Sequence, residues 1–232
     1  MDRNSNVYTF IYASVMVILV AAILSFAAIN LKPAQDNNIK IEKMQNILAS
    51  VNIEASAADA AKIYSEKIVN SYIVNSTGEK VDGDAFSVDM KKQYAQKDIS
   101  KRLLPVFECN IDGNTKYILP MYGAGLWGPI WGYISVDSDM NTVYGATFDH
   151  QGETPGLGAE ISTEPFESQF KGKTIFDTNG KLYSIIVAKS NEMAPSEHKV
   201  DAISGGTITS KGLENMIKSD LEAYQAFFNQ KK

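Results

Sequence analysis

The most prominent feature of the hydropathy pattern is a long apolar run near the amino terminus. Residues 7–31 read VYTFIYASVMVILVAAILSFAAINL and contain no charged side chain. A helix of about 20 apolar residues is enough to cross the hydrocarbon core of a bilayer. The run also exceeds the roughly 7 to 15 apolar residues of a cleaved signal peptide, and Ala27-Ala28-Ile29 is a poor cleavage site. The pattern therefore predicts a single transmembrane helix that stays attached.

After this span in the sequence, the pattern predicts a polar linker and then two helices. Residues 33–38 are polar, and the loosely helical spacing of apolar residues over 39–51 indicates a short helix. A second helix is expected over 57–74 with Ser56 as its cap. Residues 75–84 are rich in turn formers, and the polar segment 89–100 is expected to be helical.

The second half of the chain carries runs of β-branched and aromatic residues that are typical of strands. Asp-Gly, Gly-rich and Asp-Ser-Asp turns separate these runs, so they predict an antiparallel meander. The four runs lie at 103–111, 115–123, 128–137 and 142–150.

The remaining segments predict a short helix near 163–170, a strand over 181–189 and a closing amphipathic helix over 209–230. The apolar face of the closing helix is expected to carry Leu213, Met216, Ile217, Leu221, Tyr224 and Phe228. The fold class is therefore α+β: one transmembrane helix followed by a soluble domain with an antiparallel sheet and flanking helices.

Length and charge limit what the chain can be. Its 232 residues suffice for one membrane span and one soluble domain. We expect a tip and transmembrane helix over 1–32, a helical linker and the first part of the soluble domain over 33–100, and the ligand-binding domain over 101–232. The formal net charge of −5 and the absence of a basic stripe argue against binding to nucleic acid.

Residues that could ligate metals or form disulfides are scarce. Cys109 is the only cysteine, which excludes an internal disulfide, and we expect it to be a buried apolar filler. His150 and His198 are isolated from each other, so no metal site is expected. No G-x-G-x-x-G pattern follows a predicted strand, so direct binding of NADH is not expected.

Two short motifs concentrate glycines and hydroxyls. They are HQGETPGLG at 150–158 and DAISGGTITS at 201–210. The second lies at the start of the closing helix, where free backbone N–H groups and the helix dipole favour a phosphate that glycines allow to approach closely. The alternative is an ordinary glycine-rich helix entry capped by Thr209 or Ser210.

The second motif resembles the flavinylation motif D-x-x-S-G-A-T of the FMN-binding domain family, with Gly206 in place of the commoner alanine. The resemblance implies that FMN is attached to Thr207 through a phosphoester. It also implies that Ser204, Gly205, Gly206 and Thr209 form the surrounding turn.

The first motif contains E-T-P-G-L-G, which is similar to a loop that packs against the flavin ring in the same family. This implies ring contacts from Glu153, Thr154, Gly156, Leu157 and Gly158. Trp127 lies in another glycine-rich segment and is either a core aromatic or a shield for the flavin. No residue of this chain is expected to act as a catalytic acid or base.

The segments 119–137 and 43–51 resemble the C-subunit family of sodium-translocating NADH:quinone reductases, so the resemblance spans nearly the whole chain. Two alternatives stay open: the related G subunit of an Rnf-type ion-translocating complex, which shares the flavin motifs, and a membrane-anchored flavin-binding sensor module. A structural anchor without flavin is disfavoured by the intact turn over 204–207.

The resemblance to the C-subunit family implies a relay of single electrons within an enzyme complex, with no complete active site on this chain alone. The implied partners are five other subunits of the complex, membrane lipid and an extracytoplasmic flavin transferase. Because that transferase acts outside the cytoplasm, the soluble domain is expected on the periplasmic side of the inner membrane, with Arg3 in the cytoplasm. The lysines after the span, Lys32, Lys40 and Lys43, do not favour this orientation by charge alone.

Overall fold

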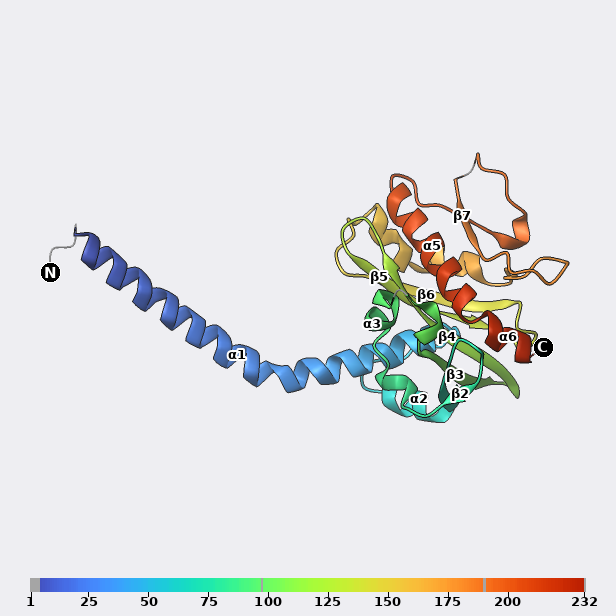
Figure 1. Cartoon of the computed structure of the whole chain (residues 1–232), viewed down its shortest axis with the longest axis horizontal. Coiled ribbons are helices and arrows are strands. Elements are labelled where there is room, and N and C mark those ends of the chain that lie inside the picture. The colour runs from blue at the N-terminus through green and yellow to red at the C-terminus, as the bar shows by residue number, and fades with distance from the viewer. Residues whose placement is uncertain (1–4, 97, 190, 232) are drawn as a thin grey trace. The chain divides into compact units, whose positions relative to one another are not determined.

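A computed structural model describes residues 5–96, 98–189 and 191–231 of the chain (Figure 1). Contacts between residues divide it into two compact units, Met1–Lys43 and Met44–Lys232. The first unit is helical, and the second holds the sheet, the remaining helices and the candidate site. Arg3 lies outside the described residues.

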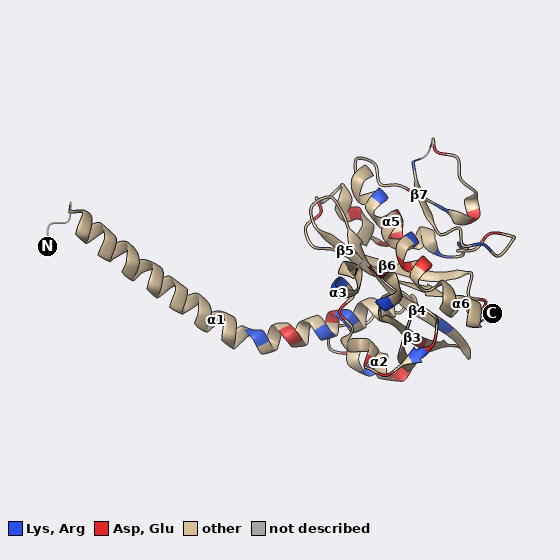
Figure 2. Cartoon of the chain, viewed as in Figure 1, with Lys and Arg blue, Asp and Glu red and all other residues tan. Residues whose placement is uncertain are grey.

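Helix α1 spans Asn6–Ala49 and contains the predicted membrane segment. Its apolar window has a mean hydropathy of 2.5 and no buried residue, so the helix is long and apolar enough to cross a membrane. In Figure 2 the amino-terminal half of the helix carries no blue or red band, so it contains no Lys, Arg, Asp or Glu, whereas such bands appear in the other half.

The predicted linker over 33–38 is wrong, because α1 continues through it with Pro33 inside the helix. An interior proline removes one backbone hydrogen bond and costs about 3 kcal/mol, yet α1 continues past it to Ala49. Lys32 and Asp36 form an ion pair one helical turn apart across this proline. The polar composition of this segment reflects solvent exposure and not a break in the helix.

The last turn of α1 belongs to the second unit, where the predicted short helix over 39–51 is confirmed as far as Ala49. Ile47 and Leu48 are fully buried. Ile47 packs in one cluster with Phe107, Cys109 and other apolar residues of the sheet. The burial expected for Cys109 is thereby confirmed, and it raises the pKa of the thiol to about 11.

The core of the second unit is a six-stranded antiparallel sheet with the order β2-β1-β3-β4-β5-β6. The predicted meander forms four consecutive strands of it: β3 (Leu104–Ile111), β4 (Asn114–Ala124), β5 (Pro129–Val136) and β6 (Val143–His150). Each pairs with the next through a short connection, as the turn residues between the runs predict.

The helix predicted over 57–74 is correct only in its first part. Helix α2 covers Ala60–Lys67, and the chain then continues as strand β1 (Ile68–Val74). Strand β1 pairs with β3, and β2 (Lys80–Val81) pairs with β1 at the edge. Four of the seven residues of β1 are β-branched, and such residues favour strands over helices. Pairing with β3 therefore outweighs the weak helical spacing of the apolar residues in this segment. Ser56 accepts a hydrogen bond from the Asp59 N–H, but Asp59 is the residue that precedes α2.

Shorter helical segments connect the strands. They are η1 (Ala85–Ser87), α3 (Met90–Ala95), η2 (Ile99–Lys101), η3 (Gly158–Ser162), α4 (Glu164–Glu167), η4 (Ser168–Phe170) and η5 (Ser196–His198). The predicted strand over 181–189 is confirmed only for β7 (Ile186–Ala188), which pairs in parallel with β8 (Lys199–Asp201). The helix predicted near 163–170 is confirmed as α4 followed by η4.

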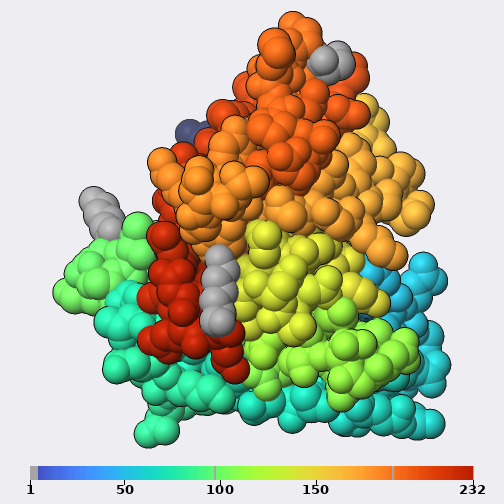
Figure 3. Space-filling model, turned by 90° about the vertical axis from the view of Figure 1, so that its right-hand side faces the viewer, coloured from blue at the N-terminus to red at the C-terminus, as the bar shows by residue number. Residues whose placement is uncertain are grey.

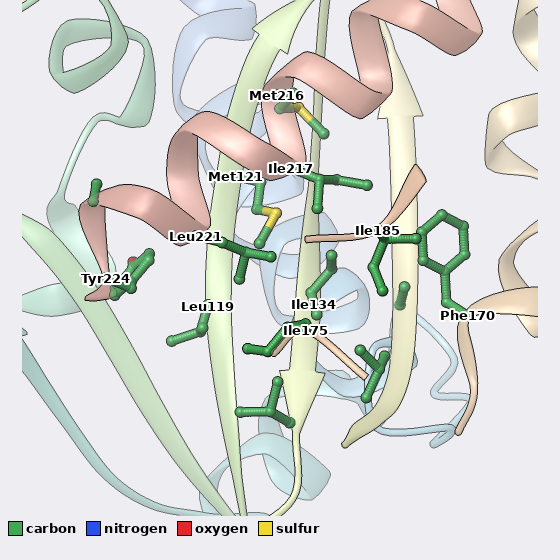
Figure 4. Close-up of a cluster of buried hydrophobic side chains, with 14 of the residues drawn as sticks. Leu119, Met121, Ile134, Phe170, Ile175, Ile185, Met216, Ile217, Leu221 and Tyr224 are labelled. Carbon is green, nitrogen blue, oxygen red and sulfur yellow. The ribbon is translucent and has the colours of Figure 1, made fainter. Parts of the chain in front are cut away.

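The closing helix is confirmed as α5 (Thr207–Ala223) and α6 (Gln225–Lys231). All six apolar residues predicted for its inner face are buried. Figure 4 shows Met216, Ile217 and Leu221 pointing from α5 toward Leu119 and Met121 of the sheet. In Figure 3 the red carboxy-terminal segment lies between teal, yellow-green and orange segments. Phe227 of α6 contacts the rings of Tyr72 and Tyr117. This packing fixes the position of the amino-terminal end of α5.

Candidate functional site

The two glycine-rich motifs meet at a pocket of about 370 Å³, at the lower end of the roughly 300 to 1,000 Å³ usual for ligand sites. Three segments line it: the connection from β4 to β5, the loop after β6 and the start of α5. The lining residues are Leu126, Trp127, Glu153, Thr154, Leu157, Gly158, Gly205, Gly206, Thr207, Ile208 and Thr209. Of the residues predicted for the site, only Ser204 and Gly156 do not line the pocket.

The start of α5 presents free backbone donors to this pocket. The helix begins at Thr207, and Gly206 precedes it without any side-chain cap. The first intrahelical bond runs from the Ser210 N–H to the Gly206 carbonyl at 2.9 Å. Within residues 5–96, 98–189 and 191–231, the N–H groups of Thr207, Ile208 and Thr209 have no acceptor. Such a cluster at the positive end of a 17-residue helix favours an anion.

The predicted capping by Thr209 or Ser210 is wrong. The helix begins two residues earlier than predicted, and neither side chain caps it. Thr209 Oγ1 donates to Glu153 Oε2 at 2.6 Å, and Ser210 Oγ accepts from the Ile203 N–H at 3.1 Å. Both residues are almost completely buried.

Thr207 differs from these neighbours because its side chain is exposed. Among the described residues its hydroxyl has no hydrogen-bond partner. Ser204 is also exposed, but it lies outside the pocket lining. Of the hydroxyls in the motif, Thr207 is thus the one that is both accessible and adjacent to the free N–H groups.

Gly205 shapes the turn before the helix. Its φ of +75° belongs to the left-handed region, and a Cβ there would lie 2.6 Å from Leu157 Cδ2. At Gly206, a Cβ would lie 2.9 Å from Ile203 Cγ2, so the alanine that is commoner in the family would require Ile203 to shift. The turn is therefore packed directly against the loop after β6.

The loop after β6 folds back on itself to face α5. The N–H groups of Leu157 and Ala159 both donate to the Thr154 carbonyl, at 3.1 and 3.2 Å. Gly156 has a φ of +75° and donates to Glu160 Oε1 at 2.9 Å, so it shapes the loop without lining the pocket. Leu157 lies against Gly205 and is 42% exposed.

Large apolar side chains surround the mouth of the pocket. Trp127 is 69% exposed, so it is not a core aromatic. Leu126 and Ile208 are 47% and 59% exposed and also line the pocket. These two were not predicted from the sequence, although each is next to a predicted site residue. Exposed apolar residues that gather at one pocket indicate a binding surface.

Titratable groups at the site are few. Glu153 is 5% exposed, and its two carboxylate oxygens accept from the Trp127 N–H and the Thr209 hydroxyl. His150 Nδ1 accepts from the Glu153 N–H at 3.2 Å. His198 is buried elsewhere beside the Thr174 carbonyl. In the described part of the chain, no group of three or more His, Cys, Asp or Glu side chains is placed to hold a metal ion.

The arrangement suits a ligand that combines an anionic group with a flat apolar one. The anion would lie against the N–H groups at the start of α5, and the flat group would lie against the apolar rim. Glycines keep the backbone clear at both positions.

Comparison with known proteins identifies such a ligand. Residues 125–222 match the family model described as the FMN-binding domain, and this range contains every residue that lines the pocket. A crystal structure of the C subunit of Na(+)-translocating NADH-quinone reductase from Parabacteroides distasonis superposes with a TM-score of 0.80 at 49% identity, covering 85% of this chain and 96% of that one. The NqrC structure of Shewanella oneidensis superposes with a TM-score of 0.70 at 30% identity and covers 83% and 97%.

Sequence relatives agree with the structural neighbours. The C subunit of the Na(+)-translocating NADH-quinone reductase of Vibrio vulnificus (strain YJ016) is 34% identical over 83% of this chain and 82% of its own length. The corresponding protein of Neisseria meningitidis serogroup B is 33% identical over 92% and 88%.

Proposed function

Because the chain belongs to the C-subunit family of Na(+)-translocating NADH-quinone reductases, we propose that it carries FMN covalently on Thr207 and relays single electrons within that complex. The chain is an FMN-binding, electron-carrying subunit of this enzyme complex. Of the families that the sequence left open, the relatives favour the reductase subunit over the Rnf G subunit and the sensor module.

The observation that carries the proposal is the position of Thr207. Its exposed hydroxyl stands beside three free N–H groups at the start of α5. A phosphoester formed there keeps a negative charge, which those donors and the helix dipole stabilise by roughly 0.3 to 1 kcal/mol at an exposed site. The donors thus lie where a phosphate linked to Thr207 would need them.

Residues of the three lining segments are proposed to hold the rest of the cofactor. Leu157, Gly158 and Thr154 offer the ring one side, and Trp127 with Leu126 offers it another. FMN supplies the redox chemistry when it is bound, while the chain binds and orients it and excludes water from it. Covalent attachment prevents loss of the cofactor by dilution, which a modest dissociation constant would not.

The proposed linkage is tested by the mass of the intact chain. Purified from its native membrane and denatured, the chain should be heavier than its sequence by one FMN less one water. Fragmentation should place the added mass on the peptide that contains 201–210. A chain of unmodified mass that releases its flavin on denaturation would refute the covalent linkage.

Membrane attachment is a property of α1, and the side on which the domain lies is part of the proposal. We propose that the domain is periplasmic, since the attachment of FMN is assigned to an extracytoplasmic transferase. The proposed partners are that transferase, membrane lipid and the other subunits of the complex.

This topology predicts how the chain responds to protease. Protease added to intact spheroplasts should degrade the domain over 44–232, because no membrane separates the two. A cytoplasmic protein serves as the control and should survive until the cells are lysed. Survival of the domain in intact spheroplasts, with digestion only after lysis, would reverse the orientation.

A further inference from the structure

The buried carboxylate of Glu153 joins the segments that line the pocket. Its Oε1 accepts from the Trp127 N–H at 2.8 Å, and its Oε2 accepts from Thr209 Oγ1 at 2.6 Å. These partners lie 26 and 56 residues away in sequence, so neither bond belongs to a local turn. The carboxylate thus links three segments: its own loop after β6, the connection between β4 and β5, and the start of α5.

Two glycines make room for this carboxylate. A Cβ at Gly125 would lie 2.4 Å from Glu153 Oε1, and a Cβ at Gly158 would lie 2.4 Å from Glu153 Oε2 and 2.5 Å from Thr209 Oγ1. Contacts that short do not occur, so any side chain at either position would displace the carboxylate. The backbone around Glu153 is therefore built to enclose it.

The charge of Glu153 has no cationic partner among the described residues. Its Oε1 accepts from a backbone N–H, which can only donate, and its Oε2 lies within hydrogen-bond distance of the Thr209 hydroxyl. Enclosing an unpaired charge is costly, and these two hydrogen bonds alone are replaceable by a neutral amide. Holding the loop in place therefore does not explain why a charged residue, and not a neutral amide, occupies position 153.

We propose that Glu153 is the positioning residue of the flavin site, holding its walls together, and that its fixed negative charge lowers the reduction potential of the flavin. The proposal rests on the proposed function, in which FMN is carried on Thr207, a residue that lines the same pocket as Glu153. An electron added to the ring adds negative charge near the carboxylate. Their repulsion is strong in a partly desolvated pocket, so the reduced state is disfavoured.

Three variants separate the effect of the negative charge from the effect of the two hydrogen bonds. In Glu153→Gln the amide oxygen can accept from the Trp127 N–H, and the amide nitrogen can donate to Thr209 Oγ1, because a hydroxyl oxygen also accepts. The ties then persist while the charge is lost. Thr209→Val keeps the charge and removes the tie to α5. Glu222→Gln makes the same charge change on the exposed face of α5 and serves as the matched control.

The full-length chain, flavinylated in its native host and purified in detergent, is measured in two ways. The mass spectrum gives the fraction of chains that carry flavin, and a dithionite titration followed by flavin absorbance gives the midpoint potential. Glu153→Gln should keep the flavin and show a more positive potential than the unmodified sequence. Glu222→Gln should match the unmodified sequence in both, and Thr209→Val should carry flavin on a smaller fraction of chains.

Each contrary result has a definite meaning. An unchanged or more negative potential in Glu153→Gln overturns the role of the charge, as does an equal shift in Glu222→Gln. Full flavin occupancy in Thr209→Val overturns the positioning role. Loss of flavin from Glu153→Gln also overturns the proposal, because the amide is expected to keep both ties. Absence of attached flavin from the unmodified chain would instead refute the proposed function itself.

Discussion

Replacing Thr207 by alanine is expected to abolish the flavin fluorescence that the chain keeps in a denaturing gel. The motif offers four hydroxyls, but those of Thr209 and Ser210 are almost fully buried and hydrogen-bonded. Thr207 alone combines an exposed hydroxyl with a place in the pocket lining. Removing that hydroxyl leaves the transferase without an acceptor, so the loss should be complete.

The matched control is Ser204→Ala, which removes the other exposed hydroxyl of the motif. It should keep its fluorescence, because Ser204 lies outside the pocket lining. Thr207→Ala should also unfold like the original chain, within about 0.5 kcal/mol, since it replaces an exposed residue in the first turn of a helix by a better helix former. Fluorescence that survives in Thr207→Ala, or that disappears only from Ser204→Ala, would assign the flavin to another residue.

The parts of the fold that could be predicted are those whose signals are local. Alternating β-branched and aromatic runs between turn residues predicted β3 to β6, and the apolar stripe predicted the buried face of α5. Strand β1 was missed because its state depends on pairing with β3, whose residues lie 30 to 41 positions later. Pro33 led to the opposite error: a linker was predicted where the structure has a continuous helix, because a long helix tolerates one proline.

The site was predictable through its motifs and not through its geometry. Resemblance to a family placed Thr207 and the loop over 153–158 in one site, and the structure brings them to one pocket. The capping expected of Thr209 failed because helix starts are uncertain by one or two residues, and that shift turned an expected cap into a partner of Glu153. The hydrogen bond between Thr209 and Glu153 joins residues 56 positions apart, so no local sequence pattern predicts it.

The carboxylate of Asp220 was also invisible in the sequence, where it resembles any polar residue of an amphipathic helix. It is 4% exposed, accepts from the Tyr122 N–H at 2.9 Å and lies 4.0 Å from an Arg102 guanidinium nitrogen. Burial raises the pKa of Asp220 from 3.8 to about 7, although the N–H donor and Arg102 each oppose the shift. The folded chain therefore holds a proton on Asp220 at pH values where the unfolded chain has released it.

Asp220→Asn is consequently expected to remove a large part of the pH dependence of stability. Stability due to the protonated carboxyl is fully present below pH 3.8 and is lost as the pH rises through about 7. At ~1.36 kcal/mol per pKa unit, the loss between these limits is on the order of 4 kcal/mol. Urea unfolding of the full-length chain at pH 5 and pH 8, followed by tryptophan fluorescence, measures the part of this loss that falls above pH 5, which is about 3 kcal/mol. Asparagine still accepts from the Tyr122 N–H but does not titrate, so the variant should show a much smaller difference between the two pH values.

The control is Asp112→Asn, in an exposed turn, which should keep the original difference in stability between pH 5 and pH 8. If Asp220→Asn also keeps that difference, another group carries the pH dependence and the carboxyl of Asp220 is not protonated in the folded chain.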